Sequence, residues 1–277
     1  MKGPHRLYAG YALDLDGTVY VGDRLLPGVL EILPPLKRRS RLVYLTNKPL
    51  ESPTAYAAKL TRLGLETDAR DIVSSTDALL LYLAENPRAA KLFVIGEVPL
   101  INLLESAGYE VADGSGAVDA VIVSFDRTFD YSKLHIAFDA VRAGARIIAT
   151  NPDPYCPIPG GGLPDCAAML AALEACTGAH AEAIVGKPSR HMTAALLDRL
   201  ALPAGDVLLV GDRLSTDIRM AREAGMVSAL VLTGATSLAD IAPSTVQPDF
   251  ILDSLWELLP DRSIITCAPT RAEQKEK

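Results

Sequence analysis

The residues best suited to chemistry stand directly after short apolar runs of this 277-residue chain. Carboxylates, a hydroxyl, an amide and a lysine each follow a different run. Ligands of open parallel sheets bind at the carboxyl ends of the strands, so we expect these side chains to meet at one edge. The segments are Asp14–Thr18 (DLDGT), Thr46–Lys48 (TNK), Gly186–Pro188 (GKP) and Gly211–Asp217 (GDRLSTD).

The carboxylates among them predict a metal site. Asp14 and Asp16 project to the same side of an extended segment, because side chains alternate with a period of two. Two carboxylates so close repel each other and raise each other's pKa unless a cation lies between them. Asp212 and Asp217 add oxygen ligands without any His or Cys, a set that suits a hard ion such as magnesium.

The remaining polar residues point to phosphate. Lys187 supplies a point positive charge, and Thr46 with the backbone of Asn47 supplies hydrogen-bond donors. A metal, an ammonium group and such donors together predict a phosphate site, where catalysis is mostly charge stabilisation and positioning. Alone, Thr46 also suits a helix N-cap, and Asp217 suits the first turn of the helix that follows. Their joint occurrence at strand ends favours the site.

The elements that must position these residues alternate between short apolar runs and longer amphipathic stretches. Continuous runs rich in Val, Ile and Leu are typical of strands that are covered on both faces. Repeated β–α alternation predicts an α/β protein with a Rossmann-like parallel-sheet core. The expected strands are Tyr11–Leu15, Arg41–Thr46, Asp71–Ser74, Lys91–Ile95, Ala120–Ser124, Arg146–Thr150, Ala183–Val185, Val207–Val210 and Ser228–Leu232. The expected helices include Gly28–Arg39, Thr54–Leu63, Ser189–Leu200 and Thr216–Ala224.

The spacing of the segments predicts an inserted domain. Asp14 and Thr46 are 32 residues apart, which holds a flap and one helix. Thr46 and Lys187 are 141 residues apart, far more than one β–α crossover needs. We expect an α/β cap that excludes water and selects the leaving group. The expected domains are a catalytic core at 1–80 and 182–265, the cap at 81–181 and a frayed tail at 266–277.

One loop of the expected cap stands out by its composition. Residues 150–164 (TNPDPYCPIPGGGLP) combine five prolines with three glycines, and a long loop inside a compact domain is usually functional. Asn151 and Asp153 are the first polar side chains after a cap strand, so we expect them to contact substrate. Both residues suit a turn beside prolines equally well.

Composition excludes several other classes. The formal charge is −7, from 27 Lys+Arg against 34 Asp+Glu, and no block of basic residues is present, so nucleic acid and anionic membranes are not expected partners. The beginning of the chain carries no apolar stretch long enough for a signal peptide, and no window suits a membrane helix. Four cysteines without zinc-ligand spacing indicate ordinary thiols and predict a cytoplasmic protein.

Four segments resemble the motifs of the haloacid dehalogenase (HAD) superfamily of phosphatases, and the resemblance runs over nearly the whole chain. They are Asp14–Thr18 (DLDGT), Leu45–Asn47 (LTN), Gly186–Pro188 (GKP) and Gly211–Asp217 (GDRLSTD). Segments between them resemble the nitrophenylphosphatase-like branch, which includes sugar phosphatases, phosphoglycolate phosphatase and pyridoxal phosphatase. The resemblance implies a magnesium-dependent phosphatase that hydrolyses small phosphomonoesters through an aspartyl phosphate. The branch segments are Ser124–Leu134 (SFDRTFDYSKL), Ala149–Pro154 (ATNPDP) and Leu230–Gly234 (LVLTG).

The resemblance also implies a role for each motif residue. Asp14 matches the nucleophile and a metal ligand. Asp16 matches the acid/base that protonates the leaving alkoxide and then activates water, and its backbone carbonyl matches a magnesium ligand. Asp212 matches a further magnesium ligand, and Asp217 matches the acid that supports the metal shell. The phosphate-holding residues are Thr46, Asn47 and Lys187.

Several alternatives stay open at this point. The substrate is a sugar phosphate or a similar metabolite, or more specifically phosphoglycolate or pyridoxal phosphate. A non-catalytic sensor of phosphorylated ligands is the alternative from another class, although it would be expected to lack Asp14 or Asp16. Lys48-Pro49 stands where many relatives carry a second Asn and small hydroxyl residues, which leaves the substrate contacts of this loop open. Relatives that pair through the cap make a homodimer a further candidate.

Overall fold

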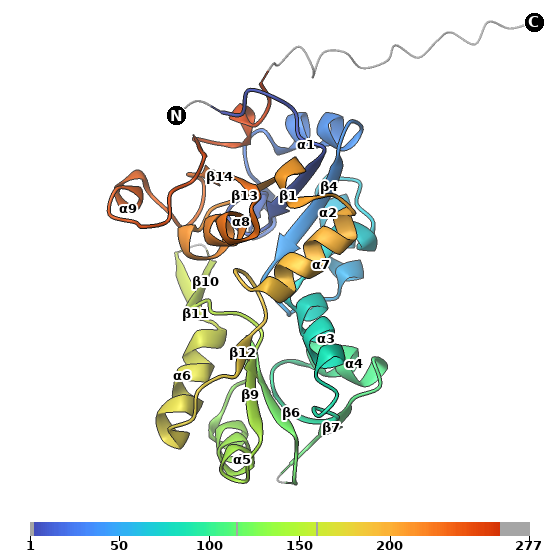
Figure 1. Cartoon of the computed structure of the whole chain (residues 1–277), viewed down its shortest axis with the longest axis vertical. Coiled ribbons are helices and arrows are strands. Elements are labelled where there is room, and N and C mark those ends of the chain that lie inside the picture. Colours follow the sequence, from blue (N-terminus) through green and yellow to red (C-terminus); the bar gives the residue numbers. More distant parts are fainter. Residues whose placement is uncertain (1–2, 115, 159, 261–277) are drawn as a thin grey trace, which may run out of the picture.

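The structure, a computed structural model, describes residues 3–114, 116–158 and 160–260. Two parallel sheets organise these residues, one in the upper and one in the lower half of Figure 1. Helices cover the faces of both sheets, which confirms the predicted α/β class with a parallel-sheet core. The predicted tail, 266–277, lies outside the described residues.

The first sheet has six parallel strands in the order β15-β14-β13-β1-β4-β5. All five residues of β1 are buried, as expected for an apolar strand at the centre of a sheet with two covered faces. Its neighbours β13 and β4 each lead into a motif segment as well, so three of the four motif segments lie at the ends of adjacent strands. The strands are β1 (Gly10–Asp14), β4 (Arg41–Thr46), β5 (Ile72–Ser74), β13 (Val207–Gly211), β14 (Val227–Val231) and β15 (Phe250–Leu252).

Helices pack on both faces of this sheet, because alternate strand residues point to opposite sides. Tyr11 and Leu13 of β1 pack with α1 (Val29–Lys37) and α2 (Pro53–Arg62). Ala12 packs in the cluster on the opposite face. That cluster includes residues of α3 (Ser75–Glu85), α7 (Arg190–Leu200) and α8 (Arg219–Ala224).

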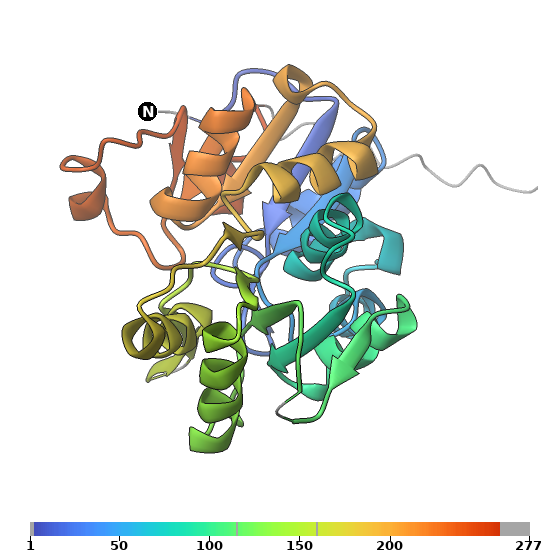
Figure 2. The same cartoon turned by 60° about the horizontal axis from the view of Figure 1, so that its bottom comes forward.

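The second sheet has five parallel strands in the order β12-β9-β8-β6-β7. One face packs on α5 (Tyr131–Arg142) and α6 (Cys166–Thr177), and the other carries α4 (Val98–Ser106) and continues into the cluster that contains α7. Figure 2 shows α5 and α6 in yellow-green on the opposite side of this sheet from α4. The strands are β6 (Lys91–Ile95), β7 (Glu110–Ala112), β8 (Ala120–Val123), β9 (Arg146–Ala149) and β12 (Ala183–Ile184).

Two short hairpins complete the fold together with a few short turns. The hairpin β2 (Tyr20–Val21) and β3 (Arg24–Leu25) is the flap expected after the first motif. The hairpin β10 (Tyr155–Ile158) and β11 (Gly161–Pro164) lies at the junction of the two sheets in Figure 1. The remaining elements are the short helix α9 (Leu238–Ile241), 3₁₀ turns at Ala69–Asp71, Ala204–Asp206 and Leu255–Glu257, and a π-helical turn at Leu214–Ile218.

All nine expected strands are present within one or two residues at each end, but one lies in an unexpected sheet. The expected domain bounds assign Ala183–Val185 to the catalytic core, whereas β12 pairs with β9 in the second sheet. Lys187 therefore reaches the site from a loop that follows a strand of the second sheet. The domain division itself stays a prediction.

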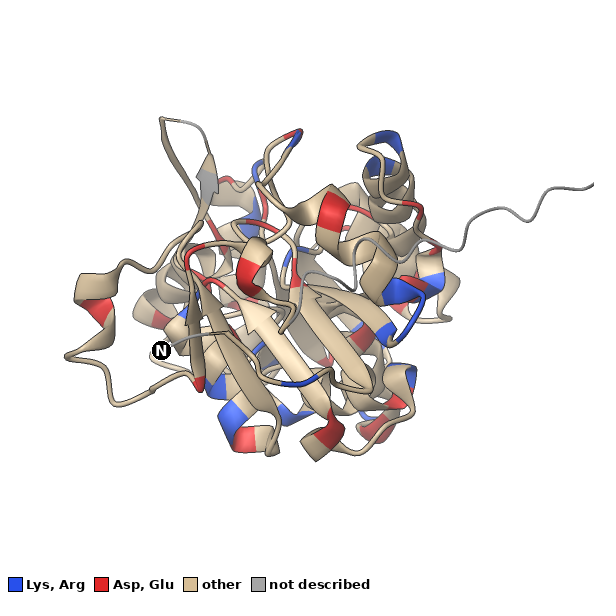
Figure 3. Cartoon of the chain, turned by 90° about the horizontal axis from the view of Figure 1, so that it is seen from above, with Lys and Arg blue, Asp and Glu red and all other residues tan. Residues whose placement is uncertain are grey.

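The helix ends follow local rules. The Ser189 side chain accepts a hydrogen bond from the Met192 amide, so it is the expected N-cap of α7. Gly225 ends α8 in the left-handed region at φ 73°, which glycine adopts without strain. Acidic and basic residues are interspersed along the ribbon in Figure 3. Among the residues described, no helix has the length and apolar character needed to cross a bilayer.

Candidate active site

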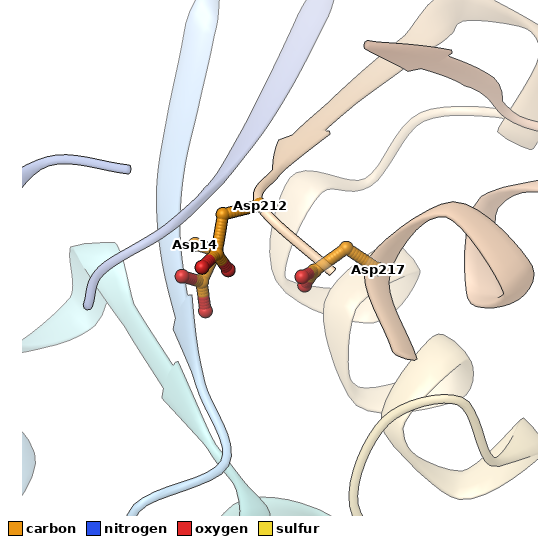
Figure 4. Close-up of side chains that lie close together, drawn as sticks. All are labelled: Asp14, Asp212 and Asp217. Atoms are coloured by element: carbon orange, nitrogen blue, oxygen red, sulfur yellow. The ribbon is translucent and has the colours of Figure 1, made fainter. Parts of the chain in front are cut away.

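The site begins where β1 and its neighbour β13 end. Leu13 pairs with Val210 in the sheet. Asp14 follows Leu13 directly and Asp212 follows Val210 after one glycine, so both aspartates lie at the same edge. The π-helical turn after β13 carries Asp217 back toward them (Figure 4). One carboxylate oxygen of each aspartate lies within 4.8 Å of the others.

Lys187 is the cation inside this carboxylate cluster. Its Nζ lies 2.5 Å from Asp14 Oδ1 and 2.7 Å from Asp217 Oδ1. The lysine is 2% exposed, and its pKa is raised above the usual value because the two carboxylates outweigh the effect of burial. The structure thus joins Lys187 to the residues of two other motifs, as the sequence predicts.

Burial also changes the carboxyl groups. Desolvation raises the pKa of Asp14 well above its usual value, and the charges of Asp217 and Asp212 raise it further against the opposing effect of Lys187. Desolvation and the charge of Asp217 raise the pKa of Asp212 to about 6. Burial is the largest cause of both shifts, and the neighbouring carboxylates add to it because like charges disfavour the ionised form.

The charge balance fits a divalent cation. Three buried carboxylates and one ammonium group carry two formal negative charges in excess, 3 − 1 = 2. The donors are oxygens alone, which magnesium and calcium prefer to nitrogen or sulfur. The trio Asp14, Asp212 and Asp217 therefore suits a divalent metal ion.

Glycines shape the space around Asp212. A Cβ atom at Gly234 would collide with the Asp212 carboxylate, and a Cβ at Gly17 would do the same. The Ala235 amide donates a hydrogen bond of 2.6 Å to Asp212 Oδ2. Gly234 ends the LVLTG segment and Ala235 follows it, so the chain at the end of this segment holds the carboxylate in place.

Asp16 is separated from the carboxylate trio. Its Oδ1 forms an ion pair of 2.6 Å with Lys48 Nζ, whereas Asp14 is paired with Lys187. Each of these two carboxylates has its own lysine, and a metal ion near both of them stays a prediction. The predicted metal contact of Asp16 is through its backbone carbonyl, and it stays a prediction.

Thr46 and Asn47, at the end of β4, line the same cavity as Asp14. Thr46 Oγ1 accepts a hydrogen bond of 3.1 Å from the Lys48 amide. Asn47 Oδ1 accepts one of 2.8 Å from the Lys187 amide, and its Nδ2 donates one of 2.8 Å to Asp153 Oδ2. The Asn47 side chain therefore fixes the loops, and the contact of its backbone with phosphate stays a prediction.

The two predicted cap contacts differ in position. Asp153 lines the cavity and faces both Asn47 and Arg213, with 3.9 Å between its Oδ1 and the Arg213 Nη1. Asn151 is fully buried, is not a lining residue, and donates to the Asn47 carbonyl at 3.1 Å. This position does not favour substrate contact by Asn151, because its amide is used to tether the loop. Substrate contact by Asp153 stays a prediction.

Further residues of the cavity were not singled out by the sequence. Tyr155 and Cys156 belong to β10, whose prolines conceal a strand, and Asp165 caps α6. Burial raises the pKa of Asp165 to about 6. Arg213 lies inside the GDRLSTD segment and donates to the Tyr155 carbonyl at 3.3 Å. Arg213 had a sequence signal in its place between Asp212 and Asp217, and Tyr155 and Cys156 had one in the composition of residues 150–164.

Comparison with known proteins agrees with this geometry. The family model described as haloacid dehalogenase-like hydrolase matches residues 11–110, and one described as HAD-hydrolase-like matches residues 184–258. The sugar-phosphatase AraL of Bacillus subtilis is 38% identical over 251 residues, which cover 90% of this chain and 92% of that protein.

Solved structures show the same relationship. A 4-nitrophenylphosphatase from Thermotoga maritima has a TM-score of 0.85 and 35% identity, over 91% of this chain and 96% of that one. A glycerol phosphate phosphatase from Mycobacterium tuberculosis in complex with magnesium has a TM-score of 0.85 and 33% identity, over 98% and 82%. The chain belongs to the haloacid dehalogenase-like hydrolases, and it is a phosphatase.

Proposed function

We propose that the chain is a magnesium-dependent phosphatase that hydrolyses small phosphomonoesters through an aspartyl phosphate on Asp14. The observation that carries the proposal is the buried trio Asp14, Asp212 and Asp217 around Lys187, in a cavity that a cap loop also lines. The names of the relatives, a sugar phosphatase, a 4-nitrophenylphosphatase and a glycerol phosphate phosphatase, support small phosphomonoesters as the substrate class.

Magnesium is the metal that the donor set supports best, since every donor is an oxygen. Asp14 and Asp212 would hold it with the backbone carbonyl of Asp16, and Asp217 would support its shell. When bound, the ion supplies positive charge that stabilises the phosphoryl oxygens. The carboxylates of the site outnumber its lysine, so phosphate is expected to bind poorly without the metal.

In the first step, a carboxylate oxygen of Asp14 attacks phosphorus. Lys187 holds Oδ1 at 2.5 Å, which orients the carboxylate and leaves the other oxygen for the attack. The bond between phosphorus and the alcohol oxygen breaks, and the alcohol oxygen takes a proton from Asp16. The products are the alcohol and the phosphoryl group on Asp14.

In the second step, Asp16 works as a base. Its carboxylate takes a proton from a water molecule, whose oxygen attacks phosphorus. The bond between phosphorus and the Asp14 oxygen breaks, which releases inorganic phosphate and restores the carboxylate. Thr46, the backbone of Asn47 and Lys187 hold the phosphoryl oxygens through both steps.

The second sheet and its helices serve as the cap in this proposal. The loop that carries Asp153, Tyr155 and Cys156 lines the same cavity as Asp14, so it is placed to exclude water and to select the leaving group. The sugar phosphates are the substrates we favour, ahead of phosphoglycolate and pyridoxal phosphate. A homodimer through the cap is a further proposal, which sedimentation of the purified protein would test.

The Asp14→Asn variant tests the assignment. We expect loss of phosphate release by about 10⁴-fold or more for every substrate of a panel of phosphomonoesters, because the nucleophile is gone. Asp71→Asn is the matched control, since Asp71 forms an ion pair of 2.7 Å with Lys37 away from the cavity. It should retain wild-type turnover.

The panel should contain sugar phosphates, phosphoglycolate, pyridoxal phosphate and p-nitrophenyl phosphate, each measured with and without magnesium. Metal-dependent release by the wild-type protein would also exclude a non-catalytic sensor, which binds phosphorylated ligands without releasing phosphate. Wild-type turnover by Asp14→Asn would show that the nucleophile is assigned wrongly.

A further inference from the structure

Lys48, in the loop after β4, forms a contact that the proposed chemistry has not used. Its Nζ lies 2.6 Å from Asp16 Oδ1, and the two side chains are 18% and 19% exposed. Cys156, from β10, lines the same cavity as Lys48 and Asp16. Lys48 therefore pairs with Asp16 in a cavity that the hairpin β10–β11 also lines.

The backbone of Lys48 is fixed on both sides. Its N–H donates to Thr46 Oγ1 at 3.1 Å, and its carbonyl accepts a hydrogen bond of 3.1 Å from the Tyr56 hydroxyl. Pro49 follows, and the residue before a proline is restricted to extended conformations. The lysine side chain therefore leaves a rigid loop, so little conformational entropy is lost when it pairs with Asp16.

The two oxygens of Asp16 have different surroundings. Oδ1 is bound by Lys48, whereas Oδ2 is buried and has no hydrogen-bond partner within the described part of the chain. A buried oxygen without a partner is costly, which indicates that substrate or water completes its environment. Because Asp16 lines the cavity beside Asp14, that partner would stand next to the nucleophile.

We propose that Lys48 is a positioning residue that holds Asp16 by Oδ1 and directs Oδ2 toward the leaving-group oxygen. The inference rests on the proposed function, in which Asp16 gives its proton to the departing alcohol. Lys48 also supplies Asp16 with a cation of its own, so that carboxylate stays apart from the trio that Lys187 serves.

The test compares two substrates of similar shape whose leaving groups differ. Phenolate needs a proton to depart, whereas p-nitrophenolate departs readily without one. The Lys48→Met variant should slow first-turnover release of phenol from phenyl phosphate by about 10–100-fold, part of what general acid catalysis provides. Release of p-nitrophenol from p-nitrophenyl phosphate should fall much less, so the ratio of the two rates changes.

Three further variants define the mechanism. Asp16→Asn should change the ratio in the same direction, and adding Lys48→Met to it should change the ratio little further, because both substitutions remove one function. Lys48→Arg keeps a cation and should restore part of the ratio. Lys37→Met is the matched control: it removes a lysine from an ion pair of 2.7 Å outside the cavity and should leave the ratio unchanged.

The contrary results are distinct from a failure of the proposed function. An equal fall for both substrates would overturn the inference, because Lys48 would then hold phosphate or the loop. A full additional loss in the double variant would overturn it as well. If Asp14→Asn is inactive and Asp16→Asn changes the ratio while Lys48→Met does not, the proposed function stands and only the role of Lys48 falls. If Asp16→Asn leaves the ratio unchanged, both the acid and its positioning residue are wrong.

Discussion

Replacing Lys187 with methionine isolates the electrostatic balance of the site. Lys187 Nζ has two carboxylate contacts, of 2.5 Å and 2.7 Å, and the side chains of Lys187, Asp14 and Asp217 are 3%, 10% and 1% exposed. Removing one partner of a buried ion pair leaves an uncompensated charge and costs about 3–5 kcal/mol. We expect a loss of this size in the free energy of unfolding of the metal-free protein near pH 8.

The loss should depend on pH. Asp14 and Asp212 have pKa values raised by burial, the latter to about 6, and removal of the ammonium raises the pKa of Asp14 further. An acid whose pKa is higher in the folded than in the unfolded protein holds its proton more tightly when folded, so stability falls as pH rises from the unfolded value through the folded one. The deficit of Lys187→Met should therefore be smaller at pH 5 than at pH 8.

Urea unfolding with and without magnesium measures both effects. Magnesium should restore about 2–3 kcal/mol to the variant at 100 times its dissociation constant, because it replaces the missing cation. Lys133→Met is the matched control: its partner Asp126 lies 2.6 Å away with a fully buried side chain, but in the second sheet domain. Magnesium should stabilise that variant only as much as it stabilises the wild-type protein, so its deficit relative to the wild type should persist. A deficit below about 1 kcal/mol at pH 8, or one equal at pH 5 and pH 8, would refute the reasoning.

Two further predictions concern the metal and the cap loop. Magnesium should raise the melting temperature of the wild-type protein more at pH 8 than at pH 5, because protons compete with the metal for Asp212, whose pKa is raised to about 6, and for Asp14, whose pKa is also raised. An equal rise at both pH values would show that the metal binds elsewhere. Asp153→Ala removes the acceptor of Asn47 Nδ2 and a partner of Arg213. We expect the binding free energy of sugar phosphates to weaken by about 1–2 kcal/mol, which raises KM about 10-fold, with a small change in melting temperature. An unchanged KM would show that the loop does not depend on this contact.

Local sequence patterns were sufficient to locate most strands and the motif residues. Continuous apolar runs mark strands covered on both faces, and in parallel sheets the polar residue after such a run lies at the ligand edge. Asp14 and Asp212 meet for this reason, since β1 and β13 are neighbours. The same rule does not explain Lys187, because the strand before it belongs to the other sheet. Lys187 reaches the carboxylates from the loop after that strand.

The features that escaped prediction depend on distant contacts or on atypical strands. Lys48 stood out only as a departure from the family pattern, and nothing local indicates that its ammonium meets Asp16, 32 residues earlier in the chain. The hairpin β10–β11 contains prolines and glycines, which normally argue against strands, so it was expected as a loop. Asn151 was assigned to substrate by its place after a strand, whereas burial decides that it tethers Asn47.

Trapping the phosphorylated enzyme tests the central claim most directly. Without its base, the Asp16→Asn variant should accumulate the intermediate when it is mixed with p-nitrophenyl phosphate and magnesium and quenched in acid. Peptide mass spectrometry is then expected to find one phosphoryl group, on Asp14, and none in the variant that also carries Asp14→Asn. A phosphoryl group on another residue, or stoichiometric p-nitrophenol release with no phosphorylated peptide, would contradict the assignment of Asp14 as the nucleophile.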